Sequence, residues 1–344
     1  MKENPADIHE SLEDFQIQDG PKAVVPMAGR NGFYSAVIED SSVQASMQSW
    51  IEMDCYQLSR GSRIAQMDCL DLGNQQIVRE SQQAAVQKQG VTPPNLCTIS
   101  YCTTDPRCRF SELDMAKDET VFFLPENTEF DIFVPAGIQT AYISLDQEEF
   151  LNSVRVLNPT AWERTPQQLL AIDTAQQGVL KETVNRWLKM AEMDVVSSSH
   201  MLTEQIHSML LQNVLQVAAS TGLDDLRPSI EKRKRALSIC RKTCDFIEDS
   251  LASDIVPTVV DICKLIGVSE RTLQYAFRSY VDMPPNVYLR FRRLNRVRAI
   301  LRASDPQSTT VTTVAMRFGF LHLGRFAHEY RQLFNESPSK TLAS

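Results

Sequence analysis

Two hydrophobic periods divide this chain of 344 residues. From Ser46 to Leu145, short runs rich in β-branched and aromatic residues alternate with turn sequences such as Gly73-Asn74 and Pro93-Pro94. This rhythm predicts antiparallel strands in a β sandwich or barrel. From Asp146 onward the period lengthens, and apolar residues recur at the spacing expected of helices. The segments with this helical spacing are 147–157, 166–173, 179–194 and 199–219.

The domain boundaries follow from these periods. A chain of this length exceeds one typical hydrophobic core, so more than one domain is expected. Residues 1–35 are polar and irregular and are predicted to form a flexible arm. A β-rich domain should span residues 36–222, a linker 223–230, and an all-helical domain 231–344. The predicted fold class is therefore α+β, with an N-terminal antiparallel, cupin-like β barrel or sandwich followed by an all-α domain.

The charge is distributed unevenly between the two parts. The chain has 35 Lys and Arg and 43 Asp and Glu, a net charge of −8. From Glu231 onward there are 19 basic and 11 acidic residues, a net of +8, whereas the other 230 residues hold 16 and 32, a net of −16. This asymmetry indicates one domain that meets phosphate and one that does not, although charges that merely solvate two surfaces would look similar.

The segment Thr258–Phe277 has the pattern of a helix-turn-helix unit. Gly267 supplies the tight turn, and Ser269 is a good N-cap for the second helix. The first helix is expected to bury Val259, Ile262, Leu265 and Ile266, and the second to bury Leu273, Ala276 and Phe277.

The second helix of this unit leaves Arg271, Gln274 and Tyr275 on its other face. Their spacing of i, i+3 and i+4 is the arrangement that a helix reading a DNA groove needs. Arginine can pair bidentately with guanine, and glutamine with adenine.

The pattern recurs in Thr312–Tyr330, where Ala315 and Gly319 each lie 52 residues after Cys263 and Gly267. A helix over Pro285–Ser304 joins the two units, and its surface is basic, with Arg290 and Arg293 among its arginines. In the second unit the aromatics Phe318, Phe320, Phe326 and Tyr330 are predicted to be core. The residues between them that could face DNA are His322, Gly324, Arg325 and His328.

The last hundred or so residues resemble the DNA-binding domain of the AraC/XylS family of bacterial regulators. The resemblance rests on IGVSERTLQYAF (266–277), YLRFRRLNRVRAIL (288–301) and GFLHLGRFAHEYRQLFNESPSKTL (319–342). The family usually has glycine in the turn after each recognition helix, where this chain has Asp282 and Asn335, which also tolerate turn conformations. The whole-chain layout, with GNQQIVRE (73–80), is more narrowly similar to regulators of ethanolamine-utilisation operons.

The resemblance implies a transcription activator whose two recognition helices enter successive major grooves of promoter DNA. It also implies recruitment of RNA polymerase, formation of a homodimer, and an N-terminal domain that binds a small effector or dimerises. Thr272 would lie near phosphate. The second helix is expected to contribute mostly DNA-backbone contacts through Arg325 and His328, because Leu323 and Gly324 at its start offer few hydrogen bonds. The DNA-binding candidates are Arg271, Thr272, Gln274, Tyr275, Arg290, Arg293, His322, Gly324, Arg325 and His328.

A β barrel can enclose one small ligand. If the effector is an amine or a related catabolite, aromatic faces or buried carboxylates should line its site. The candidates are Trp50, Tyr56, Glu80, Tyr101, Phe110 and Phe130. Aromatic residues in strands are more often simple core, and the rival hypothesis is an N-terminal domain that serves protein interaction or oligomerisation without a small ligand.

Other chemistry finds little support in the sequence. No glycine-rich phosphate loop and no nucleophile motif is present, so an enzyme is not expected. Cys240 and Cys244 are spaced to grip a metal but lie in an apolar helical stripe, which favours core, and neither a metal nor a cofactor is predicted. The chain has no apolar run near 18 residues and no secretory signal, and its eight cysteines suggest reduced thiols in the cytoplasm.

Overall fold

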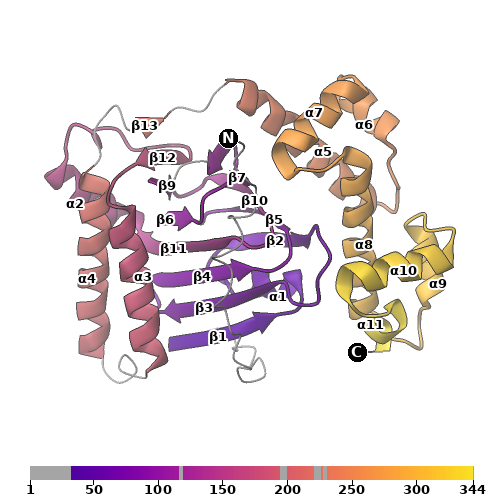
Figure 1. Ribbon diagram of the computed structural model, residues 1–344, viewed down its shortest axis with the longest axis horizontal. Coiled ribbons are helices and arrows are strands. Elements are labelled where there is room, and N and C mark those ends of the chain that lie inside the picture. Colours follow the sequence, from indigo (N-terminus) through magenta and orange to yellow (C-terminus); the bar gives the residue numbers. More distant parts are fainter. Residues whose placement is uncertain (1–31, 116–118, 194–199, 221–225, 228–230, 344) are drawn as a thin grey trace, which may run out of the picture.

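The computed structural model describes residues 32–115, 119–193, 200–220, 226–227 and 231–343. A β-rich N-terminal domain is followed by a helical C-terminal domain, which confirms the predicted α+β class (Figure 1). Residues 1–31 of the predicted arm lie outside the described residues. Strand β1 begins at Gly32, so the last four residues assigned to the arm belong to the sheet.

Every strand pair in the described part of the chain is antiparallel, and the strands form two sheets. The eight-stranded sheet contains, in spatial order, β1 (Gly32–Ile38), β3 (Ala65–Asp71), β4 (Gln76–Gln82), β11 (Gln139–Asp146), β6 (Leu96–Cys102), β9 (Thr120–Leu124), β12 (Leu170–Asp173) and β13 (Leu226–Arg227). The five-stranded sheet contains β2 (Glu52–Gln57), β5 (Val86–Val91), β10 (Glu129–Val134), β7 (Asp105–Phe110) and β8 (Leu113–Met115). A short helix, α1 (Ser41–Ser46), connects β1 to β2.

One predicted helix is wrong. The segment 166–173 carries apolar residues at helical spacing, yet Leu170–Asp173 is strand β12, paired with β9 and β13. A short apolar run cannot be assigned by period alone, and here the open edge of β9 supplies hydrogen bonds that a short helix could not match. Strand β13, within the predicted linker 223–230, adds to the same edge.

Three helices cover the outer face of the large sheet: α2 (Gln147–Leu157), α3 (Gln177–Glu192) and α4 (His200–Ala219) (Figure 1). Between them and the sheet lies a buried core in which Phe123, Phe150 and Trp162 form a mutual aromatic cluster, with ring centroids 5.3 to 5.4 Å apart. A second core lies between the two sheets and includes Met67, Val78 and Phe122. Inward-facing residues of both sheets therefore make the core of a β sandwich.

The C-terminal domain contains two helix-turn-helix units on one long helix. The helices are α5 (Glu231–Ala252), α6 (Val259–Ile266), α7 (Glu270–Val281), α8 (Pro285–Ala303), α9 (Val311–Arg317), α10 (Leu323–Phe334) and α11 (Pro338–Ala343). In the first unit the turn glycine Gly267 has φ 70°, and in the second Gly319 has φ 72°. The residues after the two recognition helices, Asp282 and Asn335, are both left-handed, at φ 52° and 56°, as the sequence predicted.

The predicted aromatic core of the second unit is confirmed: Phe318, Phe320, Phe326 and Tyr330 are buried. One predicted core residue of the first unit is wrong, because Leu265 is 60% exposed and the partly buried Cys263 packs against the core instead. An eight-residue helix buries one narrow stripe, and Leu265 falls just outside it.

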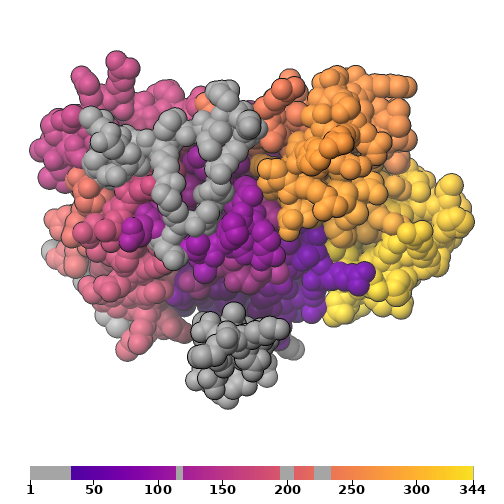
Figure 2. Space-filling model, turned by 45° about the horizontal axis from the view of Figure 1, so that its top comes forward, coloured from indigo at the N-terminus to yellow at the C-terminus, as the bar shows by residue number. Residues whose placement is uncertain are grey.

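The helical domain rests on the outer face of the small sheet. Its core continues into the β-rich domain through Leu58, Ala85 and Phe133. In Figure 2 the orange and yellow helices meet the indigo and purple domain along a broad front. Within the described ranges, none of the helices combines the length and apolar character that a membrane span requires.

Candidate nucleic-acid interface

The first recognition helix, α7, is defined by its caps. Ser269 is the N-cap, and its side chain accepts a hydrogen bond from the amide of Thr272. In the preceding helix a capping box joins Thr258 and Asp261, which satisfies two otherwise unpaired donors. These caps set where each helix begins, and so they set which α7 residues face outward.

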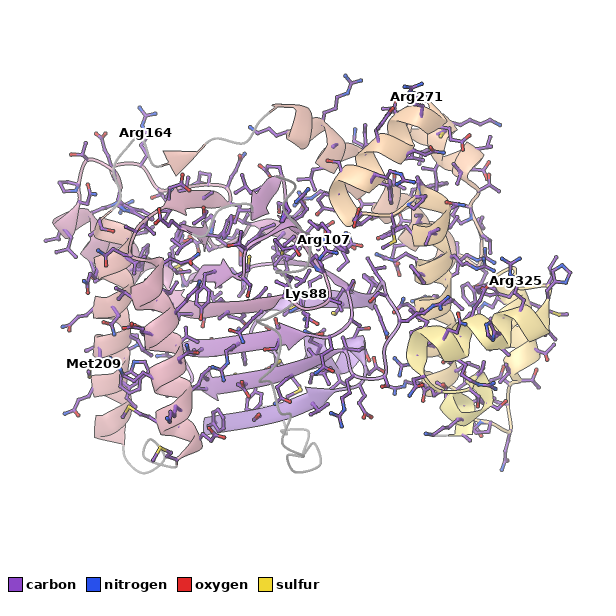
Figure 3. The ribbon with its side chains drawn as sticks, in the orientation of Figure 1. Lys88, Arg107, Arg164, Met209, Arg271 and Arg325 are labelled. Carbon is purple, nitrogen blue, oxygen red and sulfur yellow. The ribbon has the colours of Figure 1, made fainter. Side chains whose placement is uncertain are left out.

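The predicted reading face of α7 is exposed. Arg271, Gln274 and Tyr275 are all exposed, and Thr272, the predicted phosphate contact, is half-buried beside them. Arg271 Nη2 donates to Tyr275 Oη at 3.1 Å, and the guanidinium carbon lies 5.4 Å from the centre of that ring. This contact orients the guanidinium plane against the tyrosine, and Figure 3 shows Arg271 at the periphery of the domain.

The second recognition helix, α10, begins without a side-chain cap, since His322 occupies the N-cap position and makes no capping hydrogen bond. The predicted contacts His322, Gly324, Arg325 and His328 are all exposed. Arg325 Nε donates to Glu329 at 2.9 Å, and His328 lies 2.7 Å from Gln332. No heavy atom lies within 4 Å of a Cβ placed on Gly324, so the packing does not require glycine there.

The two arginines predicted on α8 are engaged within the fold. Arg290 pairs with Glu329 of α10 at 2.6 Å. Arg293 donates from Nε to the carbonyl of Phe318 at 2.7 Å and lies 4.4 Å from the ring centre of Phe320. Burial lowers the pKa of Arg293. Both side chains therefore hold the second unit against α8. The sequence did not suggest this structural role.

Four of the six predicted effector residues line one cavity between the two sheets: Glu80, Tyr101, Phe110 and Phe130. The cavity has a volume of about 70 Å³. The other two predicted residues lie elsewhere. Trp50 donates to Tyr142, which itself lines the cavity. Tyr56 lies against the helical domain, with its ring 3.4 Å from the guanidinium carbon of Arg292.

A charged pair sits in the mostly apolar wall of this cavity. Lys88 and Glu80 form an ion pair, and their side chains are only 6% and 4% exposed. Glu80 Oε1 also accepts from Gln44 Nε2 at 2.9 Å and from Gln48 Nε2 at 3.0 Å. Lys88 is labelled within the β-rich domain in Figure 3. These contacts satisfy the carboxylate fully, as a buried charge requires.

Lys88, Gln44 and Gln48 are not among the residues predicted from the sequence to line an effector site. A signal for Lys88 does exist: it shares strand parity with the buried Val86, so a regular β5 must point it into the core. Glu80 shares parity with the buried Val78 in the same way. Two inward-pointing charges of opposite sign on separate strands are therefore a readable sign of a buried pair.

The cysteines Cys240 and Cys244 are buried in the core of the helical domain, as predicted. Burial raises the pKa of Cys244 to about 11, which disfavours the thiolate that binds metals. Among the described residues, no group of three or more His, Cys, Asp or Glu side chains could hold a metal ion.

A family model described as "Helix-turn-helix domain" matches residues 262–344. The probable thc operon regulatory protein of Rhodococcus erythropolis is 38% identical over 133 residues, which are 38% of this chain and 39% of that protein. A solved structure, the AraC-like transcriptional activator CuxR, aligns over 82% of this chain and 99% of its own, with 14% identity and a TM-score of 0.39.

A shorter relative is covered for most of its length. The XylDLEGF operon transcriptional activator 2 of Pseudomonas putida is 32% identical over 141 residues, which are 41% of this chain and 82% of that protein. This chain therefore spans less than two fifths of the length of the Rhodococcus protein, but more than four fifths of the length of the Pseudomonas protein. On this match, and with two helix-turn-helix units in the matching region, the chain belongs to the AraC/XylS family of helix-turn-helix regulators.

Proposed function

We infer that this chain is a promoter-binding transcription activator whose helical domain reads DNA and whose β-rich domain binds a small effector. The single observation that supports it most is the pair of recognition helices, α7 and α10, held on one helix with their polar residues exposed. The names of the Pseudomonas relatives support activation. A regulator of this kind acts in the cytoplasm and needs no catalytic residue, cofactor or metal.

In this proposal Arg271, Gln274 and Tyr275 contact base edges in one major groove, and Thr272 contacts the adjacent phosphate. Arg325 and His328 supply contacts in the next groove, with His322 and the bare backbone at Gly324 close to the DNA backbone. Arg290 and Arg293 act mainly by positioning α10, because each already has a partner in the fold.

The test of DNA binding starts from selection of duplexes out of a random library by the full-length chain. The double variant Arg271→Ala/Arg325→Ala should lose most selective binding, because it removes an arginine from each reading face. Arg164→Ala is the matched control, since this exposed arginine lies in the β-rich domain, far from both units (Figure 3). Equal selectivity of all three proteins would refute the proposed interface.

For the effector, the charge balance of the cavity defines a ligand class. Glu80 and Lys88 neutralise each other, so a ligand with net charge would leave an uncompensated buried charge. The Lys88 ammonium has three donors, and Glu80 is its one hydrogen-bond partner among the described residues. We therefore propose a compact, mostly apolar, uncharged ligand that offers Lys88 a hydroxyl or carbonyl oxygen.

The narrower resemblance to ethanolamine-operon regulators suggests the first compounds to test. Ethanolamine, its uncharged isostere ethylene glycol, and small alcohols and amides can be compared by thermal shift on the full chain. A ligand present at 100 times its Kd stabilises the folded state by about 2.7 kcal/mol. The paired replacement Glu80→Gln/Lys88→Met should abolish the shift. Stabilisation by ethanolamine but by no neutral compound would reject the uncharged class and support the amine hypothesis.

A homodimer and contact with RNA polymerase are further parts of the proposal. Met209 on α4 is half-exposed and lies beside Trp187 and Met190 of α3, on a surface suited to a second copy (Figure 3). Met209→Glu should shift the sedimentation coefficient toward the monomer if this surface pairs.

If no compound of a broad panel changes the thermal midpoint, the alternative gains support: a β-rich domain that only interacts with proteins or oligomerises.

A further inference from the structure

Helix α1 lies between the cavity and the helical domain, and it makes polar contacts to both. We propose that α1 carries the state of the cavity to the second helix-turn-helix unit alone, through Asp40 and Arg298, while the first unit stays fixed on the β-rich domain. This inference rests on the proposed function of the cavity as an effector site. It states which contacts transmit the binding of an effector to the DNA-binding domain.

The inner contacts of α1 are made by glutamine amides. Gln44, on α1, and Gln48, just beyond its end, both donate to the same oxygen of Glu80. The other oxygen of Glu80 accepts from Lys88. Gln48 Oε1 accepts from Tyr142 at 2.8 Å, and Tyr142 also lines the cavity. A ligand that draws Lys88 away from Glu80 therefore changes the carboxylate on which both amides of the α1 segment depend.

The outer contact of α1 is made by its N-cap residue. Asp40 Oδ1 accepts from the amide and hydroxyl of Ser42 at 2.8 and 2.7 Å. Its other oxygen, Oδ2, pairs with Arg302 and lies 3.6 Å from Arg298, both on α8. One buried carboxylate thus joins the start of α1 to the long helix of the other domain.

From Arg298 the contacts continue to the end of the second recognition helix. Arg298 donates to Glu336 through Nε at 3.0 Å, and its guanidinium lies 4.5 Å from the ring centre of Phe334. Phe334 is the last residue of α10, and Glu336 follows the left-handed Asn335. The guanidinium of Arg298 therefore contacts α1 on one side and the base of α10 on the other.

The space around this connection leaves room for movement. An open cleft of about 720 Å³ separates α1 and β2 from α8, and Asp40, Arg298 and Arg302 line it. The end of α10 is also joined to the β-rich domain at the carbonyl of Leu333, which accepts from Gln57 Nε2 at 2.8 Å and from the amide of Gly61 at 3.4 Å. The end of α10 can turn about this carbonyl when the Asp40 contact changes.

The first unit is attached by contacts that bypass α1. Tyr280, in α7, donates to the carbonyl of Asp131 at 3.0 Å. Tyr288, at the start of α8, donates to Gln87 at 2.6 Å. All four residues are buried. A change at the cavity should therefore alter the placement of α10 relative to α7, and this placement determines which spacing of DNA half-sites both helices can read.

The connection can be tested without ligand or DNA, by hydrogen–deuterium exchange of the full-length chain. Asp40→Asn is the informative variant, because asparagine caps a helix as well as aspartate but cannot form the ion pairs. We expect at least a threefold faster exchange in peptides covering 323–343 and no change in 270–281. Equal acceleration of both segments, or of neither, would overturn the proposal.

A second variant tests the inner end of the same connection. Glu80→Gln keeps an acceptor for Gln44 and Gln48 but removes the charge that holds Lys88. Faster exchange should then appear in peptides covering 41–48 and 323–343 together, and a change confined to 41–48 would refute transmission. Asp68→Asn is the matched control, since Asp68 lies on the large sheet, where it accepts from Ser35 and pairs with Arg79 at 2.7 Å. Failure of the DNA or ligand tests above would reject the proposed function and leave these exchange results unaffected.

Discussion

The two helix-turn-helix units share a fold but differ in how they are attached. The first unit contacts the β-rich domain through buried side chains, with Arg292 at the centre: it donates to Gln89 and Tyr288 at 3.1 and 2.9 Å and pairs with Glu248 at 2.5 Å. The second unit is attached through the Leu333 carbonyl and through arginine pairs beside an open cleft. The attachment of the first unit resembles the core of a domain. The attachment of the second unit resembles a polar contact that can break and form again.

The exposed faces that the two recognition helices are proposed to turn toward DNA also differ. The first recognition helix presents three long polar side chains, and one of these, Arg271, is held in place by Tyr275. The second presents Gly324 where the first has Arg271, and the neighbouring Leu321 is 73% exposed. A rigidly attached unit with strong donors suits base recognition, whereas a loosely attached unit with weaker donors suits adjustable binding.

The largest expected effect comes from breaking the first attachment. Arg292 is only 2% exposed, and its removal takes a donor from Gln89 and Tyr288 and breaks the pair with Glu248, so Arg292→Ala should cost about 2–3 kcal/mol of unfolding free energy. Arg290→Ala is the matched control on the same helix and should cost no more than about 1 kcal/mol, because its pair with Glu329 is partly exposed. Urea unfolding measures both. Similar losses in the two variants would show that the Arg292 network does not set the difference between the units.

The next effect separates the two reading faces on selected DNA. Arg271→Ala should weaken the preferred site by about 1–3 kcal/mol and relax its sequence preference at one position. Arg325→Ala should weaken all sequences by a similar, smaller factor and reduce the slope of affinity against salt. Fluorescence anisotropy over a range of salt concentrations measures both. A sequence-specific loss in Arg325→Ala would mean that the second unit reads bases as well.

A smaller effect concerns the helix caps. Ser269→Ala removes the N-cap hydrogen bond of α7 and should cost about 1 kcal/mol of unfolding free energy. His322→Ala removes a side chain that caps nothing and should change stability by less than about 0.5 kcal/mol. Chemical unfolding of the two variants makes the comparison, and a larger loss in His322→Ala would contradict the difference in capping.

The smallest effect is a pH dependence at the first attachment. Burial raises the pKa of Asp131 above its ordinary value, although hydrogen bonds from Gln87 and Gln89 partly oppose the shift. The folded chain therefore binds this proton more tightly than the unfolded chain. The resulting stabilisation is full below the ordinary carboxyl pKa of about 3.9 and is lost as the pH rises through the folded value. Relative to Asp131→Asn, the unvaried chain should lose unfolding free energy as the pH rises above about 3.9. Urea titrations at several pH values measure this, and a constant difference between the two proteins would contradict this assignment.

Much of the helical domain could be predicted from the chain alone. Helix caps, turn glycines and helical spacing are local properties, so they identified both units, and Asp282 and Asn335 took the left-handed turns expected of them. The β-rich domain could be predicted only as a class. Its strand runs are local, but Leu170–Asp173 became a strand because β9 offered a free edge, and no local pattern contains that information.

The candidate sites divide along the same line. The sequence by itself determined which residues α7 and α10 could present, because a helix fixes the face of each side chain through its period. Only the tertiary structure decided what the buried charges do. Lys88 and Glu80 lie on different sheets, and Asp40 and Arg298 lie in different domains, so their pairing depends on how the sheets and domains pack. An ion pair is a property of distance in space, and distances between residues far apart in sequence exist only once the chain has folded.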